Sequence, residues 1–227
     1  MDKHTAAKKA AGEKAADLIM PGMTIGLGTG STAYWTIQKI GERVKAGLDI
    51  RAVATSVASE TLARELNIPI VPFPEITHID LDIDGADEVD DHLQLTKGGG
   101  GALLREKIIA TASRRMIVVI DAAKKVPVLG RFPLPVEVVP FGWELTFRRL
   151  AALELNPALR EKDGQPYITD NGNYILDCHC GSIPRPEALH TTLNLIPGVV
   201  ENGLFIDIAD TVIIGQEDGS TAVLRRS

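Results

Sequence analysis

The sequence predicts an α/β protein, a mostly parallel sheet covered by helices on both faces, with a smaller α+β unit inserted before its last strands. Short apolar runs alternate with helical segments through the first half of the chain, and strands joined by helices form parallel sheets with right-handed crossovers. Beyond Pro127 the pattern changes to prolines around a β-branched run, a hairpin turn and two further helical segments. We therefore expect a large domain at residues 1–130 and 208–227 and a smaller one at residues 131–207.

The elements of the large domain are bounded by residues that start or stop regular structure. A helix at residues 6–19, rich in Ala and Lys, is stopped by Pro21-Gly22, and Thr55-Ser56 supplies a cap for a helix that ends near residue 66. The other expected helices lie at residues 33–46 and 102–112. The expected strands are residues 23–27, 50–54, 68–71, 79–84, 116–120, 210–215 and 221–224.

The small domain is expected to have the element order β-α-β-β-α-β, which is that of a ferredoxin-like unit. Its expected elements are a strand at residues 136–139, a helix at 143–155, strands at 167–169 and 174–180, a helix at 186–195 and a strand within 199–208. The segment Asp170-Asn171-Gly172-Asn173 between the two middle strands is typical of a hairpin turn.

Composition and charge exclude several classes of protein. The chain has 24 basic and 30 acidic residues, a net charge of −6, and only 4% aromatic residues, which argues against phosphate-backbone binding and base stacking. Two cysteines, Cys178 and Cys180, are too few for a disulfide scaffold. No apolar signal segment begins the chain, and the uncharged stretch 18–38 is too rich in Gly, Thr and Ser for a membrane helix. We expect a soluble cytoplasmic protein that binds neither nucleic acid nor membranes.

Residues 26–32, Gly-Leu-Gly-Thr-Gly-Ser-Thr, lie between an expected strand and an expected helix. Backbone N–H groups at a helix start, together with hydroxyls, suit a phosphate. The alternative is a tight turn capped by Ser31 or Thr32. The segment is not a Walker motif, because no Lys follows its last glycine. It is also a poor dinucleotide fingerprint, because Ser31 replaces a glycine and the next strand ends without an acidic residue.

Three carboxylates, Asp80, Asp82 and Asp84, share one face of an expected strand. Like charges in a row repel, so we expect the last of them at the open strand end, where a carboxylate can do acid–base work. A calcium loop is the alternative, but its twelfth position is Asp91 instead of Glu, and apolar residues alternate with the acids as in a buried strand.

Four consecutive glycines, residues 98–101, follow Lys97 and precede a helix. Such a run costs backbone entropy that a simple connector rarely justifies, so we expect this loop to wrap closely around a ligand, with the Lys97 charge at its mouth. Glu106 has mainly apolar helical neighbours, and such surroundings should raise the pKa of its carboxyl and suit it to shuttle a proton. The alternative is an ordinary surface glutamate.

The segment Cys178-His179-Cys180 resembles a metal cluster only superficially. On a strand the two cysteines face one side and His179 the other, and two ligands make a poor zinc site. Lys124 follows a central strand at its carboxyl end, where α/β sheets bind ligands. Lys8, beside a second lysine, has its simplest interpretation as part of a solvated helix face.

Three of these segments together resemble the ribose-5-phosphate isomerases of type A. They are Gly-Thr-Gly-Ser-Thr at residues 28–32, Asp-Gly-Ala-Asp-Glu at 84–88, and Lys-Gly-Gly-Gly at 97–100 followed by Glu106. The likeness runs nearly end to end and includes residues 105–110, 132–138, 169–173 and 196–200. The resemblance implies a Rossmann-like catalytic domain with a ferredoxin-like insert.

The resemblance also implies an activity, the interconversion of ribose 5-phosphate and ribulose 5-phosphate through an enediolate in the non-oxidative pentose phosphate pathway, without metal or organic cofactor. Glu106 would move the proton between C2 and C1, Lys97 would stabilise the oxyanion, and Asp84 would act on hydroxyl protons and assist ring opening. Asp87 would hold a sugar hydroxyl or orient its neighbours. The other residues implied to lie along the substrate are Thr29, Gly30, Ser31, Thr32, Gly85, Ala86, Gly98, Gly99, Gly100, Lys124 and, near the phosphate, Lys8. A homodimer or tetramer is implied as well.

Three other functions remain open at this point. A sugar-phosphate sensor would have this fold without turnover, but such a regulator should carry a separate DNA-binding domain, and the sequence has no spare basic segment. A nucleotide-dependent dehydrogenase is disfavoured by the glycine spacing. An isomerase of another aldose phosphate differs only in how its pocket accommodates one carbon.

Overall fold

The computed structural model describes residues 2–226 and divides the chain into two compact units. The first comprises Met1–Ala86, Arg105–Lys125 and Ile208–Ser227, and the second comprises Asp87–Leu104 and Val126–Asp207. Residues 87–104 and 126–130, which we expected in the large domain, thus pack with the second unit. The division into two domains at residues 130 and 207 stays a prediction.

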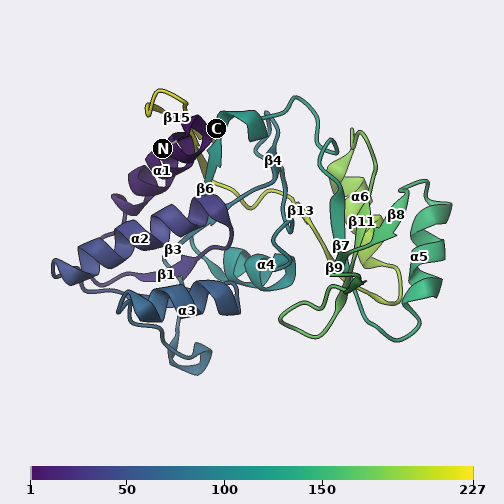
Figure 1. Cartoon of the computed structure of the whole chain (residues 1–227), viewed down its shortest axis with the longest axis horizontal. Coiled ribbons are helices and arrows are strands. Elements are labelled where there is room, and N and C mark those ends of the chain that lie inside the picture. The colour runs from purple at the N-terminus through teal and green to yellow at the C-terminus, as the bar shows by residue number, and fades with distance from the viewer. Residues whose placement is uncertain (1, 227) are drawn as a thin grey trace. The chain divides into compact units, whose positions relative to one another are not determined.

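The first unit is built on a six-stranded sheet with the order β15-β14-β6-β3-β1-β2 (Figure 1). All its neighbouring strands are parallel except β14 and β15. Helices α1, α2 and α3 pack on one side of this sheet, where residues of all three share the main hydrophobic core, and α4 packs on the other side through Ile109. The strands are β1 (Thr24–Leu27), β2 (Arg51–Ala54), β3 (Leu81–Gly85), β6 (Met116–Asp121), β14 (Thr211–Gly215) and β15 (Thr221–Arg225). The helices are α1 (Lys3–Ala16), α2 (Ser31–Lys45), α3 (Val57–Glu65) and α4 (Leu103–Ala112), with short 3₁₀ turns η1 (Phe73–Glu75) and η2 (Ala122–Lys124).

These elements match the expected ones to within three residues at each end, the largest shift being in α1, expected at residues 6–19 and observed at Lys3–Ala16. The exception is the strand expected at residues 68–71. There the structure has a single parallel bridge between Ile70 and Ala52. Pro69 and Pro72 flank this bridge, and proline has no N–H with which to extend a ladder. The cap expected for α3 is confirmed, because the Ser56 side chain accepts a hydrogen bond from the Ser59 N–H at 3.1 Å.

Strand β3 separates an apolar face from a charged one. Leu81 and Ile83 belong to the main hydrophobic core, which α1 and α2 cover. Asp82 and Asp84 alternate with them on the opposite face, and both are 0% exposed. A smaller apolar cluster that includes Ile109 of α4 occupies this second side of the sheet. The sheet therefore holds two carboxylates in its interior, on the side of α4.

The second unit contains a four-stranded antiparallel sheet with the order β12-β7-β11-β8. Its elements are β7 (Leu134–Val138), α5 (Trp143–Ala152), β8 (Pro157–Leu159), β11 (Tyr174–Cys178), α6 (Pro186–Asn194) and β12 (Val199–Asn202). This is the ferredoxin-like arrangement, with the fourth strand beside the first and the third beside the second.

One strand of this sheet was assigned wrongly from the sequence. The second strand is β8, not residues 167–169, which have no regular structure. Thr169 instead closes a turn: its hydroxyl accepts the Asn173 N–H at 3.1 Å and donates to the buried Glu137 carboxylate at 2.9 Å. Between β8 and that turn the chain forms a small ribbon of β9 (Glu161–Lys162) and β10 (Gln165–Pro166).

A second small sheet in this unit has no counterpart among the expected elements. It has the order β13-β5-β4 and comprises β4 (Glu88–Val89), β5 (Leu95–Thr96) and β13 (Leu204–Phe205). Strands of two residues are too short to show an alternating pattern. The sheet matters because Asp87 immediately precedes β4 and Lys97 immediately follows β5.

Candidate active site

Gly26 of β1 and Gly28, the residue directly after β1, make room for carboxylates on the neighbouring strand. Gly26 pairs with Asp82 in the sheet, and a Cβ atom at Gly26 would lie 2.5 Å from Asp82 Oδ1. A Cβ atom at Gly28 would overlap the Asp84 carboxylate. These glycines are therefore required by neighbouring side chains of the protein itself, whatever ligand binds beyond them.

The Asp84 carboxylate is held in one orientation by backbone donors. Its Oδ1 accepts hydrogen bonds from the Thr29 N–H at 2.9 Å and the Gly85 N–H at 2.7 Å. The Thr29 hydroxyl turns away, into a buried cluster with the hydroxyls of Thr55, Ser56 and Ser59 at 2.7 to 3.2 Å. Thr29 thus shapes this loop through its own packing, and its predicted contact with substrate stays untested.

In the described part of the chain, no side chain forms a capping hydrogen bond at the start of helix α2. Its N-cap is Gly30, at a φ of 101°, so the alternative interpretation, a turn capped by Ser31 or Thr32, is wrong. The open first turn leaves the positive end of the helix dipole available to an anion.

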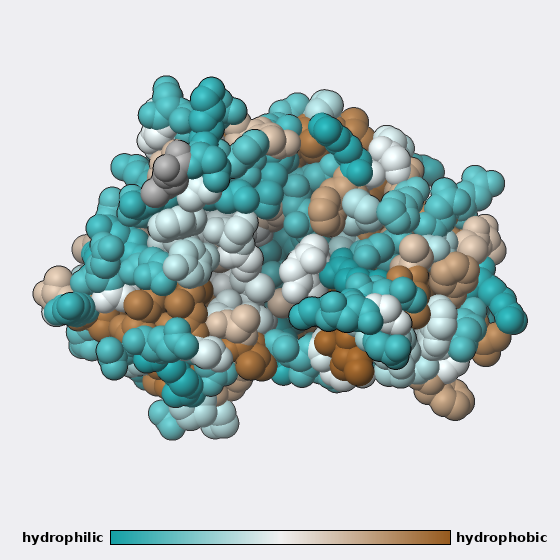
Figure 2. All heavy atoms as spheres, in the orientation of Figure 1, coloured by the Kyte–Doolittle hydropathy of each residue, from teal (hydrophilic) through white to brown (hydrophobic). Residues whose placement is uncertain are grey.

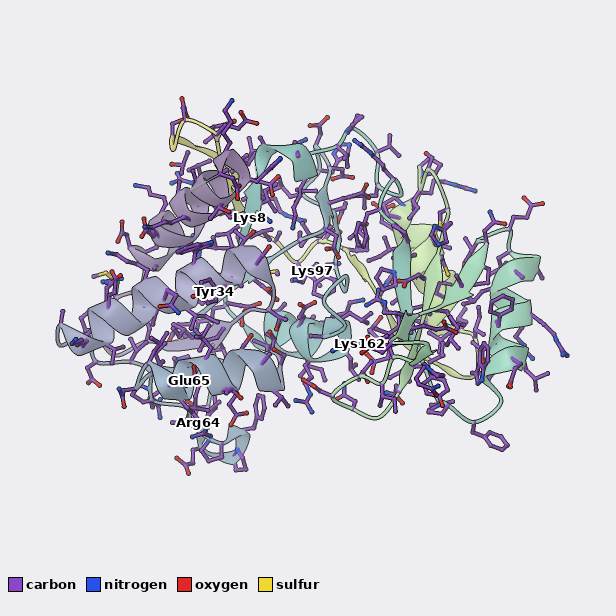
Figure 3. The ribbon with its side chains drawn as sticks, viewed as in Figure 1. Lys8, Tyr34, Arg64, Glu65, Lys97 and Lys162 are labelled. Atoms are coloured by element: carbon purple, nitrogen blue, oxygen red, sulfur yellow. The ribbon has the colours of Figure 1, made fainter. Side chains whose placement is uncertain are left out.

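Lys8 lies close to that helix start. A Cβ atom at Gly12, one turn further along α1, would lie 3.1 Å from the Thr32 carbonyl oxygen of α2. On the other side of Lys8, Ala7 contacts Gly215 at the carboxyl end of β14. Half-buried Lys8 lies between these two contacts, at the carboxyl edge of the sheet (Figure 3).

Glu106 is buried, with 3% of its surface exposed, so its interpretation as a surface glutamate is wrong. A Cβ atom at Gly26 would lie 2.6 Å from Ile109, which shows that Ile109 faces the sheet. Glu106 precedes Ile109 by three positions and shares its face. The residue after α4, Ser113, bridges Ile79 before β3 begins, so α4 runs antiparallel to β3.

This antiparallel packing sets the height of Glu106 above the sheet. Ile109 lies level with Asp82, since both meet the Cβ position of Gly26. One turn back along α4 and two residues forward along β3 are both about 5 to 7 Å in the same direction. Glu106 is therefore level with Asp84, at the carboxyl end of β3.

Lys124 lies where the sequence places it, after the carboxyl end of β6 in the 3₁₀ turn η2. Its ammonium donates to the Ala86 carbonyl at 2.5 Å. The segment Asp84-Gly85-Ala86 is thereby tied to the loop after the neighbouring strand. The first unit thus gathers Lys8, the start of α2, the end of β3, Glu106 and Lys124 at one edge of its sheet.

The remaining predicted residues belong to the second unit and are grouped there. Lys97 is 2% exposed, its N–H donates to the Gly203 carbonyl at 2.8 Å, and its ammonium lies 5.4 Å from the centre of the Phe205 ring. The Asp87 carboxylate accepts the Gly99 N–H at 2.7 Å. The small sheet therefore holds Asp87, Lys97 and the start of the glycine loop together.

Sequence reasoning missed two residues of this group. Buried Glu88 accepts the N–H groups of Gly130 and Phe132 at 2.7 and 2.8 Å, and the Phe132 ring packs against Gly99. Arg160 donates to the carbonyls of Gly98 and Gly99. Glu88 stands within a motif that the sequence analysis singled out, whereas nothing around Arg160 in the sequence marks it.

The two candidate metal sites, the acidic segment that begins at Asp80 and the cysteine segment at residues 178–180, do not have the surroundings of a metal site. Asp80 accepts the Thr24 N–H and pairs with Arg114, and the residues after it form a strand, so the calcium-loop interpretation is wrong. Cys178 lies in the hydrophobic core of the second unit, and burial raises the pKa of its thiol. Among residues 2–226 no group of three or more His, Cys, Asp or Glu side chains has a metal-binding arrangement.

Comparison with known proteins gives a consistent result. Residues 51–219 match the family model of ribose 5-phosphate isomerase A (phosphoriboisomerase A). Ribose-5-phosphate isomerase A of Bacillus cereus is 56% identical over 93% of this chain and 97% of its own. The enzyme of Sphingopyxis alaskensis is 51% identical over 96% of each chain.

Solved structures agree with these sequence matches. A D-ribose-5-phosphate isomerase in complex with phospho-erythronic acid superposes with a TM-score of 0.93 at 42% identity, over 96% of this chain and 97% of that one. The isomerase A of Neisseria gonorrhoeae gives a TM-score of 0.91 at 41% identity, over 100% and 98%. Separately, no helix in residues 2–226 has the length and apolar character needed to span a membrane.

Proposed function

The chain belongs to the ribose-5-phosphate isomerase A family and interconverts ribose 5-phosphate and ribulose 5-phosphate, and we propose that Glu106, Asp84, Lys97 and Asp87 carry this reaction. Aldose and ketose differ by the position of one carbonyl. Their interconversion moves a proton between C2 and C1 and another between the two oxygens, through an enediolate. The step belongs to the non-oxidative pentose phosphate pathway.

Glu106 is the proposed base. The observation that carries this assignment is its burial, at 3% exposure, on the sheet-facing side of α4 and level with Asp84. A carboxylate removed from bulk water is a stronger base toward carbon. Glu106 takes the proton from C2 and returns it to C1 of the enediolate.

In this proposal Asp84 and Lys97 act on the oxygen atoms of the sugar. Asp84, held by the Thr29 and Gly85 N–H groups, accepts and returns hydroxyl protons and assists opening of the furanose ring. Lys97 donates to the oxygen that gains negative charge in the enediolate. Asp87, which also fixes Gly99, binds a sugar hydroxyl.

The proposed position of the phosphate is the start of α2. Gly30, Ser31 and Thr32 present backbone N–H groups there, and Lys8 adds a positive charge. Thr29, Gly85, Ala86, Gly98, Gly99, Gly100 and Lys124 complete the proposed set of residues along the substrate. Because every step moves protons and no electrons leave the sugar, we propose that the reaction needs no metal or organic cofactor.

Assembly and cellular location extend this proposal. Apolar side chains reach the surface in the second unit, where Phe141 is 94% and Leu145 62% exposed at the start of α5. Others gather over α2 and α3 of the first unit (Figure 2). We propose a homodimer formed through the second unit, working in the cytoplasm with Cys178 and Cys180 as free thiols. Light scattering of the wild type and of Leu145→Glu tests this, since only the variant should be monomeric.

The activity itself is tested by ribulose 5-phosphate formation from ribose 5-phosphate by purified protein in excess EDTA. Rapid turnover under these conditions supports the cofactor-free reaction. Turnover only after a divalent metal is added back, or only with another aldose phosphate, contradicts that part of the proposal. Ribose 5-phosphate that raises the melting temperature without any turnover favours a sensor.

A further inference from the structure

We propose that Arg160 is a positioning residue of the isomerase site. Held by Asp177, it fixes the peptide planes of Gly98 and Gly99 and so holds the glycine loop that directly follows Lys97. This proposal rests on the assignment of Lys97 and the glycine loop to the substrate site. Arg160 has no part in the roles assigned above.

Arg160 is held rigidly before it reaches the loop. It directly follows β8, and its partner Asp177 lies on the adjacent strand β11. Arg160 Nε donates to one carboxylate oxygen of Asp177 at 2.8 Å, and Nη2 donates to the other at 2.5 Å. The side chains are 15% and 22% exposed. A two-point contact with the planar fork of arginine fixes its direction as well as its distance.

The remaining nitrogen of the guanidinium binds the glycine loop. Nη1 donates to the Gly98 carbonyl at 2.9 Å and to the Gly99 carbonyl at 3.2 Å. On the opposite side of the same peptide, the Gly99 N–H donates to Asp87 at 2.7 Å. The peptide between Gly98 and Gly99 is therefore gripped at its carbonyl by Arg160 and at its N–H by Asp87.

Such a grip is needed because the loop has little stiffness of its own. Glycine restricts its backbone less than any other residue, and Gly98 and Gly101 both have positive φ, 104° and 82°. Lys97, the residue before this loop, is almost fully buried, so a shift of the loop displaces the ammonium within a closed environment. The carbonyl contacts thus hold Lys97 to one position.

Tyr167, seven residues after Arg160, contacts both Arg160 and the glycine loop. Its N–H donates to the Arg160 carbonyl at 2.8 Å, and its ring centre lies 5.9 Å from the guanidinium carbon. A Cβ atom at Gly101 would lie 2.6 Å from the Tyr167 ring. The loop is therefore contacted at its start by Arg160 and at its end by Tyr167.

Loss of an arginine from an ordinary exposed ion pair should leave kcat unchanged. Arg64 and Glu60 on α3 form a charge pair at 2.7 Å with side chains 60% and 42% exposed, and such a pair contributes little. Arg64→Ala is therefore a matched control for loss of an arginine. Exposed Lys162, two residues after Arg160, is the control for loss of a nearby cation (Figure 3).

The test compares kcat and KM of Arg160→Ala and Arg160→Lys with those of the two controls. A displacement of about 1 Å in a catalytic group costs on the order of 10- to 100-fold in rate, so we expect this loss in kcat for Arg160→Ala, with KM changed less than about threefold. Arg160→Lys should recover little, because one ammonium cannot grip Asp177 and both carbonyls. Arg64→Ala and Lys162→Ala should keep wild-type kcat.

Rescue separates positioning from a general loss of structure. Guanidinium chloride at millimolar concentration should restore part of the kcat of Arg160→Ala, with no effect on Arg160→Lys. A wild-type kcat for Arg160→Ala overturns the proposal. So does a loss that follows the unfolded fraction by circular dichroism and that guanidinium leaves unchanged. If Lys97→Met keeps full activity, the site assignment itself fails; if it loses activity and Arg160→Ala does not, only the positioning role fails.

Discussion

The glycines at positions 26 and 28 belong to a strand and its continuation, whereas those at 98–101 form a loop. In the first segment the backbone is extended and hydrogen-bonded within the sheet, and the Cβ positions are occupied by Asp82 and Asp84. In the second, Gly98 and Gly101 have positive φ, and side chains of other segments grip the backbone. Glycine thus makes space for carboxylates in one segment and supplies conformational freedom in the other.

This difference bears on the roles proposed for the two segments in the reaction. The first brings carboxylates into a rigid sheet, where their positions follow from strand register. The second directly follows the buried Lys97, and its glycine backbone is contacted by the side chains of Asp87 and Arg160. Substitutions in the two segments should therefore fail in different ways.

The largest effect is expected on the carboxylate side, from Glu106→Gln. The amide keeps the shape of the side chain but cannot accept the C2 proton, and a positioned base contributes about 10²- to 10⁴-fold. We expect kcat to fall by that factor while calorimetric binding of ribose 5-phosphate is preserved. Glu65→Gln, on the exposed end of α3, is the control and should be unchanged. Near-normal turnover by Glu106→Gln would show that another group is the base.

The loop side is tested by Lys97→Met, which keeps the length of the side chain and removes its charge. Loss of one oxyanion donor typically costs about 10²- to 10³-fold in kcat, slightly less than loss of the base. Steady-state kinetics should place most of this loss in kcat, because the oxyanion develops only during the reaction. Lys162→Met controls for removal of an exposed lysine. A pure rise in KM would instead assign Lys97 to ground-state binding.

Alanine substitutions of glycine separate space from conformational freedom. Gly28→Ala places a Cβ atom against Asp84, and such overpacking destabilises by about 1–3 kcal/mol; we expect kcat to fall as well, because Asp84 must move. Gly47→Ala meets no neighbour but has a φ of 101°, which costs roughly 1–2 kcal/mol of stability with kcat unchanged. Denaturant unfolding and kinetics check both. Equal losses of kcat in the two variants would contradict the distinction between glycines required for space and glycines required for a positive φ.

The smallest effect concerns Cys180. Burial raises the pKa of this thiol from 9.0 to about 11, so it should stay protonated and react slowly with iodoacetamide at pH 8, and quickly after unfolding. Because the unfolded thiol ionises first, stability present below pH 9.0 should decline as the pH rises toward about 11. Cys180→Ser should lack this decline. Fast alkylation of the folded protein would contradict the burial.

The sequence predicted the elements around the carboxylates better than those around the loop. Strand β1 lies in a short apolar run that ends at a glycine segment, and β3 alternates apolar with acidic residues, so the ends of both strands, and hence Asp84, were located closely. The short strands β4 and β5 show no alternating pattern. The second strand of the four-stranded sheet was predicted at residues 167–169 because a turn sequence follows them, whereas the structure has it at β8. Arg160 directly follows β8, the strand that the sequence did not indicate, so its approach to Gly98 could not be predicted.

The space requirement at Gly28 also lay beyond the sequence. It depends on the parallel pairing of β1 with β3, which brings Gly26 beside Asp82. No local pattern specifies which strands become neighbours when 55 residues separate Thr29 from Asp84. Motif spacing indicated that these segments act together, but the contacts that join them required the fold.

The central claim, that Glu106 moves a proton between C2 and C1, is tested most directly by isotope exchange. Ribulose 5-phosphate formed in D₂O is analysed for deuterium at C1 by NMR, with the wild type and Glu106→Gln at equal active-site concentration. We predict deuterium at C1 with the wild type, because a proton held by the carboxylate exchanges with solvent, and a loss of exchange in Glu106→Gln that parallels its loss of kcat. Wild-type exchange by Glu106→Gln would contradict the account.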